Sequence, residues 1–407
     1  MEEKKIILII IFSLTYLGLA FGSIPGLLID RAGISLIGSA LIILFGIMTT
    51  HEALEHIDIS TILLLYGLMV LSAQLRIGGF YTKVALLIMK NIKSPKILLL
   101  QIMIASALLS AILANDIVCL AFTPVVAYST LKSGINPIPF LIALAVSSNI
   151  GSASTIVGNP QNMFIGQFAK LDFLSFILWC SPPSVLSLLA SYLIILTIFR
   201  KKWTLPADKI QIPEKIWDEF NKHHSIKGLI FVVITILLFF TPIPREIIAT
   251  TAASLLMISR YISTRKLLEL VDWSLIILFI CLFIIVGAIS KYQIPQDILS
   301  VLEKYGLNIN DPLHLSLTTV IISNIFSNVP AVMLLINTLD KTTENYYILA
   351  VSSTFAGNLL TIGSIANLIV IEQAKNFGVK ITFLEYAKTG IPVTLVSIVL
   401  LLIWIRI

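Results

Sequence analysis

The sequence predicts an all-α polytopic membrane protein made of two inverted repeats. Three observations support this prediction. Hydrophobic residues make up 57% of the 407 residues and charged residues only 12%, about half the charged fraction of a soluble domain. Apolar runs of membrane-spanning length recur along the chain, and these runs form two matching series. Each repeat is expected to have five crossings and one re-entrant hairpin, with broken helices at the midplane.

The apolar runs fall on either side of one polar stretch, residues 200–225. The first series is 6–28, 32–49, 60–76, 97–131, 137–170 and 173–199. The second series is 226–241, 245–260, 272–290, 311–341, 345–376 and 381–405. The predicted domains are therefore a first repeat, 1–199, a linker, 200–225, and a second repeat, 226–407. The first run has no clean small-residue cleavage site, so we expect a retained helix rather than a signal peptide.

The two series match residue by residue. Arg31 to Asp58 spans 27 positions, and Arg245 to Asp272 spans the same 27. The other matched pairs, at offsets of 213 or 205, are Asn115 with Asn328, Ala145–Ser148 with Ala350–Ser353, Gly158 with Gly363, and Asn162 with Asn367. Such ordered self-similarity is typical of duplicated transporters.

The orientation of the halves follows from the two longest runs. Segments 97–131 and 311–341 carry a polar cluster at the middle, so each is predicted to be a hairpin that returns to its own side. Five crossings are an odd number, which inverts the second half. The Lys- and Arg-rich loops 76–96, 200–225, 260–266 and 375–380 then share one side, which the positive-inside rule makes cytoplasmic. Both termini are predicted to be external, in the cell membrane, and 79–93 and 294–305 to be interfacial helices.

Four interruptions of the apolar runs are the predicted site. They are Ala114–Asp116, Ser148–Asn162, Ser327–Pro330 and Gly357–Asn367. Lipid offers no hydrogen bonds, so irregular backbone at membrane depth lines a cavity or packs on protein. Unwound carbonyls suit Na⁺, and half-helix N-termini suit an anion.

The candidate residues are the polar and glycine positions of these interruptions. The predicted substrate-binding residues are Asn115, Ser148, Asn149, Thr155, Asn159, Ser327, Asn328, Thr361 and Ser364. The predicted ion-coupling residues are Asn115, Asp116, Gly158, Asn328 and Gly363. No cofactor or resident metal is expected beyond H⁺ or Na⁺ as the coupling ion. The expected partners are a small solute and the bilayer, and not nucleic acid, because the +6 charge lies in short loops.

Asp116 has two interpretations. A carboxylate near the bilayer centre costs several kcal/mol and marks a functional position. Alternatively, it caps a helix that begins at Ile117. The second repeat has Val329 at the matching position, so a proton or Na⁺ is expected on the first side only. Asp58 and Asp272 are predicted to cap helices, and Arg31 and Arg245 to anchor helix ends at the interface.

These loops resemble those of the ion transporter superfamily, which includes arsenite/antimonite permeases, divalent anion–sodium symporters and citrate carriers. The resemblance rests on Ala114–Asp116 with Phe122–Pro124, on Asn149–Asn162, and on Ser327–Val329 with Val332–Leu335. It covers about residues 15–405 and is closest to the arsenite-permease branch. It implies inverted repeats, elevator-like movement, a homodimer, and transport of a small anion coupled to H⁺ or Na⁺. The tips lack the Ser-Asn-Thr of the dicarboxylate branch.

Other functions remain as alternatives. A Na⁺/H⁺ antiporter would use Asp116 as its shared site. A passive channel fits the same loops. An intramembrane enzyme is not expected, because only Asp116 is a deep aspartate and all five histidines fall in loops. No P-loop sequence occurs, which excludes a pump driven through that motif.

Overall fold

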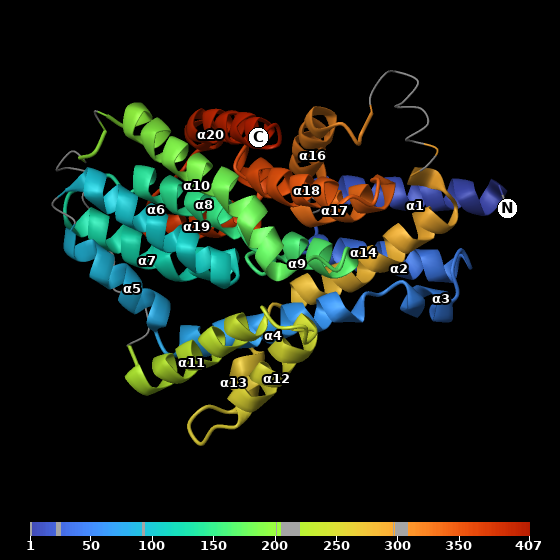
Figure 1. Cartoon of the computed structure of the whole chain (residues 1–407), viewed down its shortest axis with the longest axis horizontal. Helices are drawn as coiled ribbons and strands as arrows, with labels where there is room; N and C mark the ends of the chain where they lie inside the picture. Colours follow the sequence, from blue (N-terminus) through green and yellow to red (C-terminus); the bar gives the residue numbers. More distant parts are fainter. Residues whose placement is uncertain are drawn as a thin grey trace.

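The computed structural model describes residues 2–21, 26–91, 94–200, 202–204, 220–295, 297 and 308–407. These residues are almost all helical, and an isolated bridge between Ile135 and Thr204 is the one β-type contact among them (Figure 1). Six helices of this described part are long and apolar enough to cross a membrane: α1, α4, α6, α10, α14 and α20. The prediction of an all-helical, multi-pass membrane protein is confirmed.

Each predicted apolar run contains at least one helix. The helices of the first half are α1 (Glu2–Phe21), α2 (Arg31–Leu44), α3 (Thr50–Glu55), α4 (Ile59–Ile77), α5 (Phe80–Ile88), η1 (Met89–Asn91), α6 (Pro95–Ile112), α7 (Asn115–Lys132), α8 (Ile138–Ser152), α9 (Pro160–Phe168) and α10 (Phe173–Ile198).

The helices of the second half repeat this order. They are α11 (Lys222–Leu238), α12 (Arg245–Met257), α13 (Thr264–Leu268), α14 (Trp273–Lys291), α16 (Pro312–Phe326), α17 (Asn328–Leu335), η3 (Ile336–Thr338), α18 (Thr343–Ala356), η4 (Thr361–Gly363), α19 (Ile365–Lys375) and α20 (Phe383–Trp404).

The predicted interruptions coincide with helix ends. Helix α6 ends at Ile112 and α7 begins at Asn115, and α8 and α9 are separated by residues 153–159. In the second half α16 stops before Ser327, whose φ is 77°, and residues 357–364 separate α18 from α19. Helix α5 lies within the predicted interfacial stretch 79–93. Most of the other such stretch, 294–305, lies outside the described residues, as do linker residues 205–219.

Two aspartates start matching helices in the two halves. The Asp58 carboxylate accepts the backbone N–H of Thr61, the third residue of α4, at 3.2 Å. The Asp272 carboxylate accepts that of Leu275, the third residue of α14, at 3.0 Å. These bonds satisfy N–H groups that have no partner within the helix. The capping prediction for both residues is confirmed.

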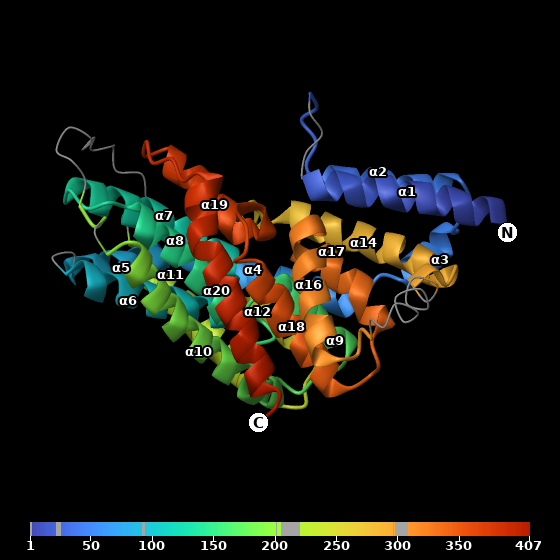
Figure 2. The same ribbon diagram turned by 90° about the horizontal axis from the view of Figure 1, so that it is seen from above.

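Helices of one half pack on helices of the other. Helix α4 packs against α12, and α14 packs against α2. In Figure 1, α4 lies with α11, α12 and α13, while α6, α7 and α8 lie together at the far end from the N-terminus. Figure 2 shows α1 and α2 side by side along one edge. We call α2, α4, α12 and α14 the crossed frame.

The centre of the molecule is filled by the two helices that precede the long interruptions. Every residue of α8 from Pro139 to Ser152 is buried, and so is every residue of α18 from Asn345 to Ala356. Helix α8 approaches α6 so closely that a Cβ atom on Gly151 would lie 2.3 Å from the Cα atom of Ala107. Only glycine fits there, because the neighbouring atoms belong to the backbone.

Gly151→Val should therefore force α6 and α8 apart and destabilise the protein. Overpacking of this kind costs about 1–3 kcal/mol or more, so the melting temperature in detergent should fall by several degrees. Leu108→Val is the control, because Leu108 lies beside Ala107 on α6 but is 62% exposed. Equal melting temperatures for the two variants would contradict this account of the contact.

Candidate functional site

A buried hydrogen-bond network built on Asn149 joins the two halves. The Asn149 amide nitrogen donates to Oδ1 of Asn358 at 2.9 Å and to Oδ1 of Asn367 at 3.1 Å. Its Oδ1 atom accepts from Asn115 Nδ2 at 3.1 Å and from Ser364 Oγ at 2.9 Å. The amide thus uses both of its protons and both oxygen lone pairs. A buried amide with all of its hydrogen bonds made fixes the relative positions of its partners.

The first hairpin tip docks on the broken helix of its own half. The backbone N–H of Asn115 donates to the carbonyl oxygen of Gly158 at 3.4 Å. The Ser148 hydroxyl donates to the carbonyl oxygen of Asn115 at 3.2 Å. Thr155, also predicted to lie in the site, donates its hydroxyl proton to the carbonyl oxygen of Ala111 near the end of α6. Three of the predicted positions therefore hold this tip in place.

The second tip contacts the matching residues of its repeat, but through the side chain of its asparagine instead of the backbone. Both neighbours of the Asn328 amide are carbonyl acceptors, so its nitrogen faces them. It donates to Ser353 O at 3.1 Å and to Gly363 O at 3.2 Å. Ser353 and Gly363 match Ser148 and Gly158 at the offset of 205. Each tip asparagine is therefore bound to the same serine and the same glycine of its repeat.

Two further asparagines keep the broken helices open. Asn162 Nδ2 donates to the carbonyl oxygens of Ser152 at 3.3 Å and Thr155 at 3.0 Å. Asn367 Nδ2 donates to the carbonyls of Gly357 at 2.6 Å and Leu360 at 3.2 Å. In both cases the acceptors lie ten and seven positions earlier in the chain. This identity supports the internal repeat. Neither residue was among the predicted ligands, although their alignment was visible in the sequence.

The remaining predicted residues have different positions. Asn159 caps α9 by accepting the N–H of Asn162 at 2.9 Å, and its nitrogen donates to Thr354 Oγ1 at 3.2 Å. Ser364 caps α19 in the same way. Thr361 lines a cavity of about 500 Å³ with Glu372 and Lys375 instead of joining the network. Ser327 provides the backbone turn between α16 and α17.

Helix ends of both polarities meet at these interruptions. Helices α7, α9, α17 and α19 begin there, and α6, α8, α16 and α18 end there. First-turn N–H groups carry partial positive charge, and last-turn carbonyls carry partial negative charge. The site can therefore favour an anion and a cation side by side, although the four loops contain no lysine or arginine.

Asp116 lines a cavity of about 160 Å³. It is the second residue of α7, whose N-cap is Ala114, without a side-chain cap bond. The predicted cap for a helix starting at Ile117 is therefore wrong, because α7 begins two residues earlier. Arg76 and Asp272 share the cavity. The rest of its wall is mostly apolar: Leu65, Leu68, Met69, Ala114, Ile117, Leu120, Pro160, Met163, Leu270, Leu275 and Ile369.

Arg76 also lines a second cavity, of about 250 Å³, which reaches Thr82 and Gln373. The two cavities share Arg76 and Leu120 in their walls. No pattern in the sequence predicts Arg76 at this cavity, because it lies at the far end of α4 from that helix's cap.

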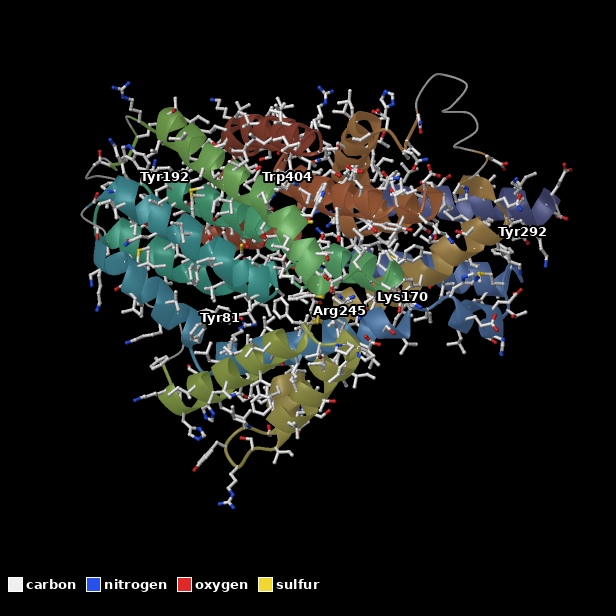
Figure 3. All side chains as sticks on the ribbon, in the orientation of Figure 1. Tyr81, Lys170, Tyr192, Arg245, Tyr292 and Trp404 are labelled. Carbon is white, nitrogen blue, oxygen red and sulfur yellow. The ribbon has the colours of Figure 1, made fainter. Side chains whose placement is uncertain are left out.

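Arg245, predicted to anchor a helix end at the interface, binds backbone carbonyls at the end of α9. Its guanidinium donates to Leu171 O at 2.7 Å and to Gly166 O at 2.9 Å, just beyond and within the last turn of α9. It lies beside Lys170 (Figure 3). Both residues line a cavity of about 820 Å³, together with Asp58 and Glu246.

Comparisons with known proteins show that this chain is similar to transporters. A family model described as citrate transporter (CitMHS) matches residues 6–346. The silicon efflux transporter LSI3 of Oryza sativa subsp. japonica is 26% identical, over 95% of this chain and 94% of that protein. The Dictyostelium discoideum transporter arsB is 26% identical, over 91% and 86%.

A solved structure has the same fold. The Alcanivorax borkumensis YdaH transporter, whose crystal structure is described as having an unusual topology, superposes with a TM-score of 0.56. The match covers 99% of this chain and 98% of that one, at 13% identity.

The matched asparagines should be equally sensitive to loss of their amide protons. Asn162→Asp and Asn367→Asp each remove two donors and place an oxygen against two carbonyls. A buried polar group left unpaired costs about 1–3 kcal/mol, so both melting temperatures should fall, by similar amounts. Ser154→Ala is the control, since Ser154 bonds only within its own turn. A loss in one variant alone would argue against equivalent roles.

Proposed function

Since the chain belongs to the citrate transporter family, we propose that it is a secondary active transporter of a small anion or oxyanion. The substrate is arsenite-like or a di- or tricarboxylate, and its movement is coupled to H⁺ or Na⁺. The observation that carries this proposal is the buried asparagine network at the four interruptions. A neutral, hydrogen-bonded site between helix ends suits a small solute that crosses without a covalent step.

Anion selectivity is assigned to backbone and amide donors. The first turns of α7, α9, α17 and α19 face the interruptions, and helix N-termini bind oxyanions and carboxylates readily. The Asn115 amide, which uses one of its two protons for Asn149, adds a donor without adding charge. Arg76, which lines both the Asp116 cavity and the cavity beside it, attracts the anion toward this region. The name of the silicon efflux transporter agrees with a small solute.

Coupling is assigned to Asp116. An ionised carboxylate in the 160 Å³ cavity repels an anion, whereas a protonated or Na⁺-paired one does not. Binding of the cation therefore favours binding of the anion, and each raises the affinity for the other. Val329 occupies the matching position of the second tip and cannot do this. The coupling ion is accordingly handled on the side of the first hairpin.

The proposed movement is of the elevator type. The asparagine bonds join both tips and both broken helices into one body, which we call the site domain. Its neighbour across the Asp116 cavity is the crossed frame, which contributes mostly apolar side chains. Apolar surfaces can slide past each other without breaking hydrogen bonds. We further propose inverted repeats with boundaries at 1–199 and 226–407, a cytoplasmic linker at 200–225, external termini, a location in the cell membrane and a homodimer.

A Na⁺/H⁺ antiporter is the second candidate. It is favoured by one observation: Asp116 and Asp272, from different helices, line the same cavity. Two carboxylates can exchange protons for a metal cation. Cation-driven currents in the absence of every organic or oxyanion solute would support the antiporter over the anion transporter.

Asn115→Ala and Asn328→Ala should abolish uptake while the protein stays folded. Each variant loses amide bonds that hold a tip on its broken helix, and a loss of at least about tenfold is expected from about 1.4 kcal/mol. The measurement is uptake of arsenite, sulfate, citrate and succinate into proteoliposomes. Asn136→Ala is the control, because Asn136 bonds to Lys202 O in a loop. Full activity in both tip variants would disprove the site.

Asp116→Asn should remove the dependence of uptake on Na⁺ or on pH. The amide cannot gain or lose a proton and binds Na⁺ far less strongly than a carboxylate. Uptake rates should be compared across pH and Na⁺ gradients with those of Asp30→Asn, which alters a surface helix cap. If the Asp116 variant retained the ion dependence of the native protein, Asp116 would have no coupling role.

A further inference from the structure

One end of a broken helix is tied to the crossed frame by a charged side chain. Arg245, the first residue of α12, donates to the carbonyl oxygens of Gly166 and Leu171 at the end of α9. Carbonyls at a helix C-terminus lack partners within the helix, and a cation there also interacts favourably with the helix dipole. Arg245 therefore supplies both hydrogen bonds and charge to the site domain from outside it.

The next residue strengthens the same junction. The Glu246 carboxylate accepts from Gln167 Nε2 on α9 at 3.0 Å and from Ser60 Oγ on α4 at 3.4 Å. Hydrogen bonds to an ionised group are stronger than neutral ones. Together, Arg245 and Glu246 connect α9 to two helices of the crossed frame. We call this pair the α9 clamp.

The repeat provides an equivalent arginine that makes a different contact. Arg31 matches Arg245 at the offset of 214, and Ala32 matches Glu246. The Arg31 Nε atom donates to Leu19 O on α1, at 3.3 Å. It lines a cavity of about 410 Å³ with Asp272, Ser274 and Leu368.

Helix α19, the counterpart of α9, is not held in the same way. Its positions matching Gly166 and Leu171 at the offset of 205 are Ile371 and Asn376. The hydrogen bond that Arg31 makes goes to Leu19 O on α1, and not to a carbonyl of α19. Arg245 thus binds the end of α9, whereas a cavity lies between α19 and Arg31, the arginine that matches Arg245.

We infer that Arg245 and Arg31 are alternating positioning residues of the transport cycle. In the described conformation Arg245 holds the end of α9. In the opposite conformation Arg245 releases it, and Arg31 binds the carbonyls near Ile371 and Asn376 at the end of α19. The inference rests on the proposed elevator movement. Because Ala32 replaces Glu246 in the second clamp, the described conformation is the more strongly held of the two.

Two matched cysteine reporters distinguish the conformations. Leu120 lines both cavities that meet at Arg76, while Met333, its match at the offset of 213, is only 1% exposed. In a background without Cys119, Cys180 and Cys281, Leu120→Cys should react with a maleimide faster than Met333→Cys. The labelling rate of Met333→Cys divided by that of Leu120→Cys is the labelling ratio. It rises with the population of the opposite conformation.

Arg245→Gln should raise this ratio by at least about tenfold, because it removes charge-assisted bonds made in one conformation only. Arg31→Gln should leave the ratio unchanged or lower it. Lys227→Gln is the matched control: Lys227, on α11, donates to Leu256 O and Ile258 O at the other end of α12. This control should not move the ratio.

An unchanged ratio in Arg245→Gln, or a rise of equal size in Arg31→Gln, would overturn the inference. Melting temperatures verify that the variants are folded. If Arg245→Gln does not fold, the labelling ratio is measured in Arg245→Lys and Glu246→Gln instead. Each of these changes removes only part of the clamp. If the native protein takes up a solute but the labelling ratio does not change in the variants, the proposed clamps are wrong and the proposed transport function stands. If the labelling ratio changes but no solute is taken up, the clamps stand and the proposed transport function is wrong.

Discussion

The structure depends on hydrogen-bond partners for the backbone groups that are left unpaired where helices break in apolar surroundings. Unpaired carbonyls in such surroundings cost several kcal/mol each. Asn162 and Asn367 meet this requirement by bridging two carbonyls apiece across an interruption. Asn149 then binds the interruptions to one another. Small neutral amides do this in little space, which leaves helix ends of both polarities grouped in one region.

Local features of this fold could be predicted from the sequence, and crossed contacts could not. The interruptions and the Asp58 and Asp272 caps depend on residues within a few positions, so composition and spacing were sufficient. The position of Arg76 beside Asp116 depends on how α4 meets α7, which no local pattern encodes. The cap predicted for Asp116 is wrong because α7 already begins at Asn115, whose backbone N–H donates to Gly158 O.

The two halves share a backbone plan but differ in charge. The bridges of Asn162 and Asn367 are repeated position for position, and each tip asparagine contacts the matching serine and glycine of its repeat. Two charged groups are not repeated: Asp116 is matched by Val329 and Glu246 by Ala32. Hydrogen bonds that hold a shape must be kept in both halves, whereas a directional process needs the halves to differ. The differences lie at the edge of the site domain, where it faces the crossed frame.

The neutrality of the asparagine network has an electrical consequence. Moving one elementary charge through a membrane potential of 100 mV involves about 2.3 kcal/mol. Asn115, Asn149, Asn328, Asn358 and Asn367 carry no net charge, so their displacement involves no such work. In the proposed movement, the voltage sensitivity of a turnover is set by the cargo, the coupling ion and Asp116. The same framework can then operate in membranes of very different potential without altered hydrogen bonding.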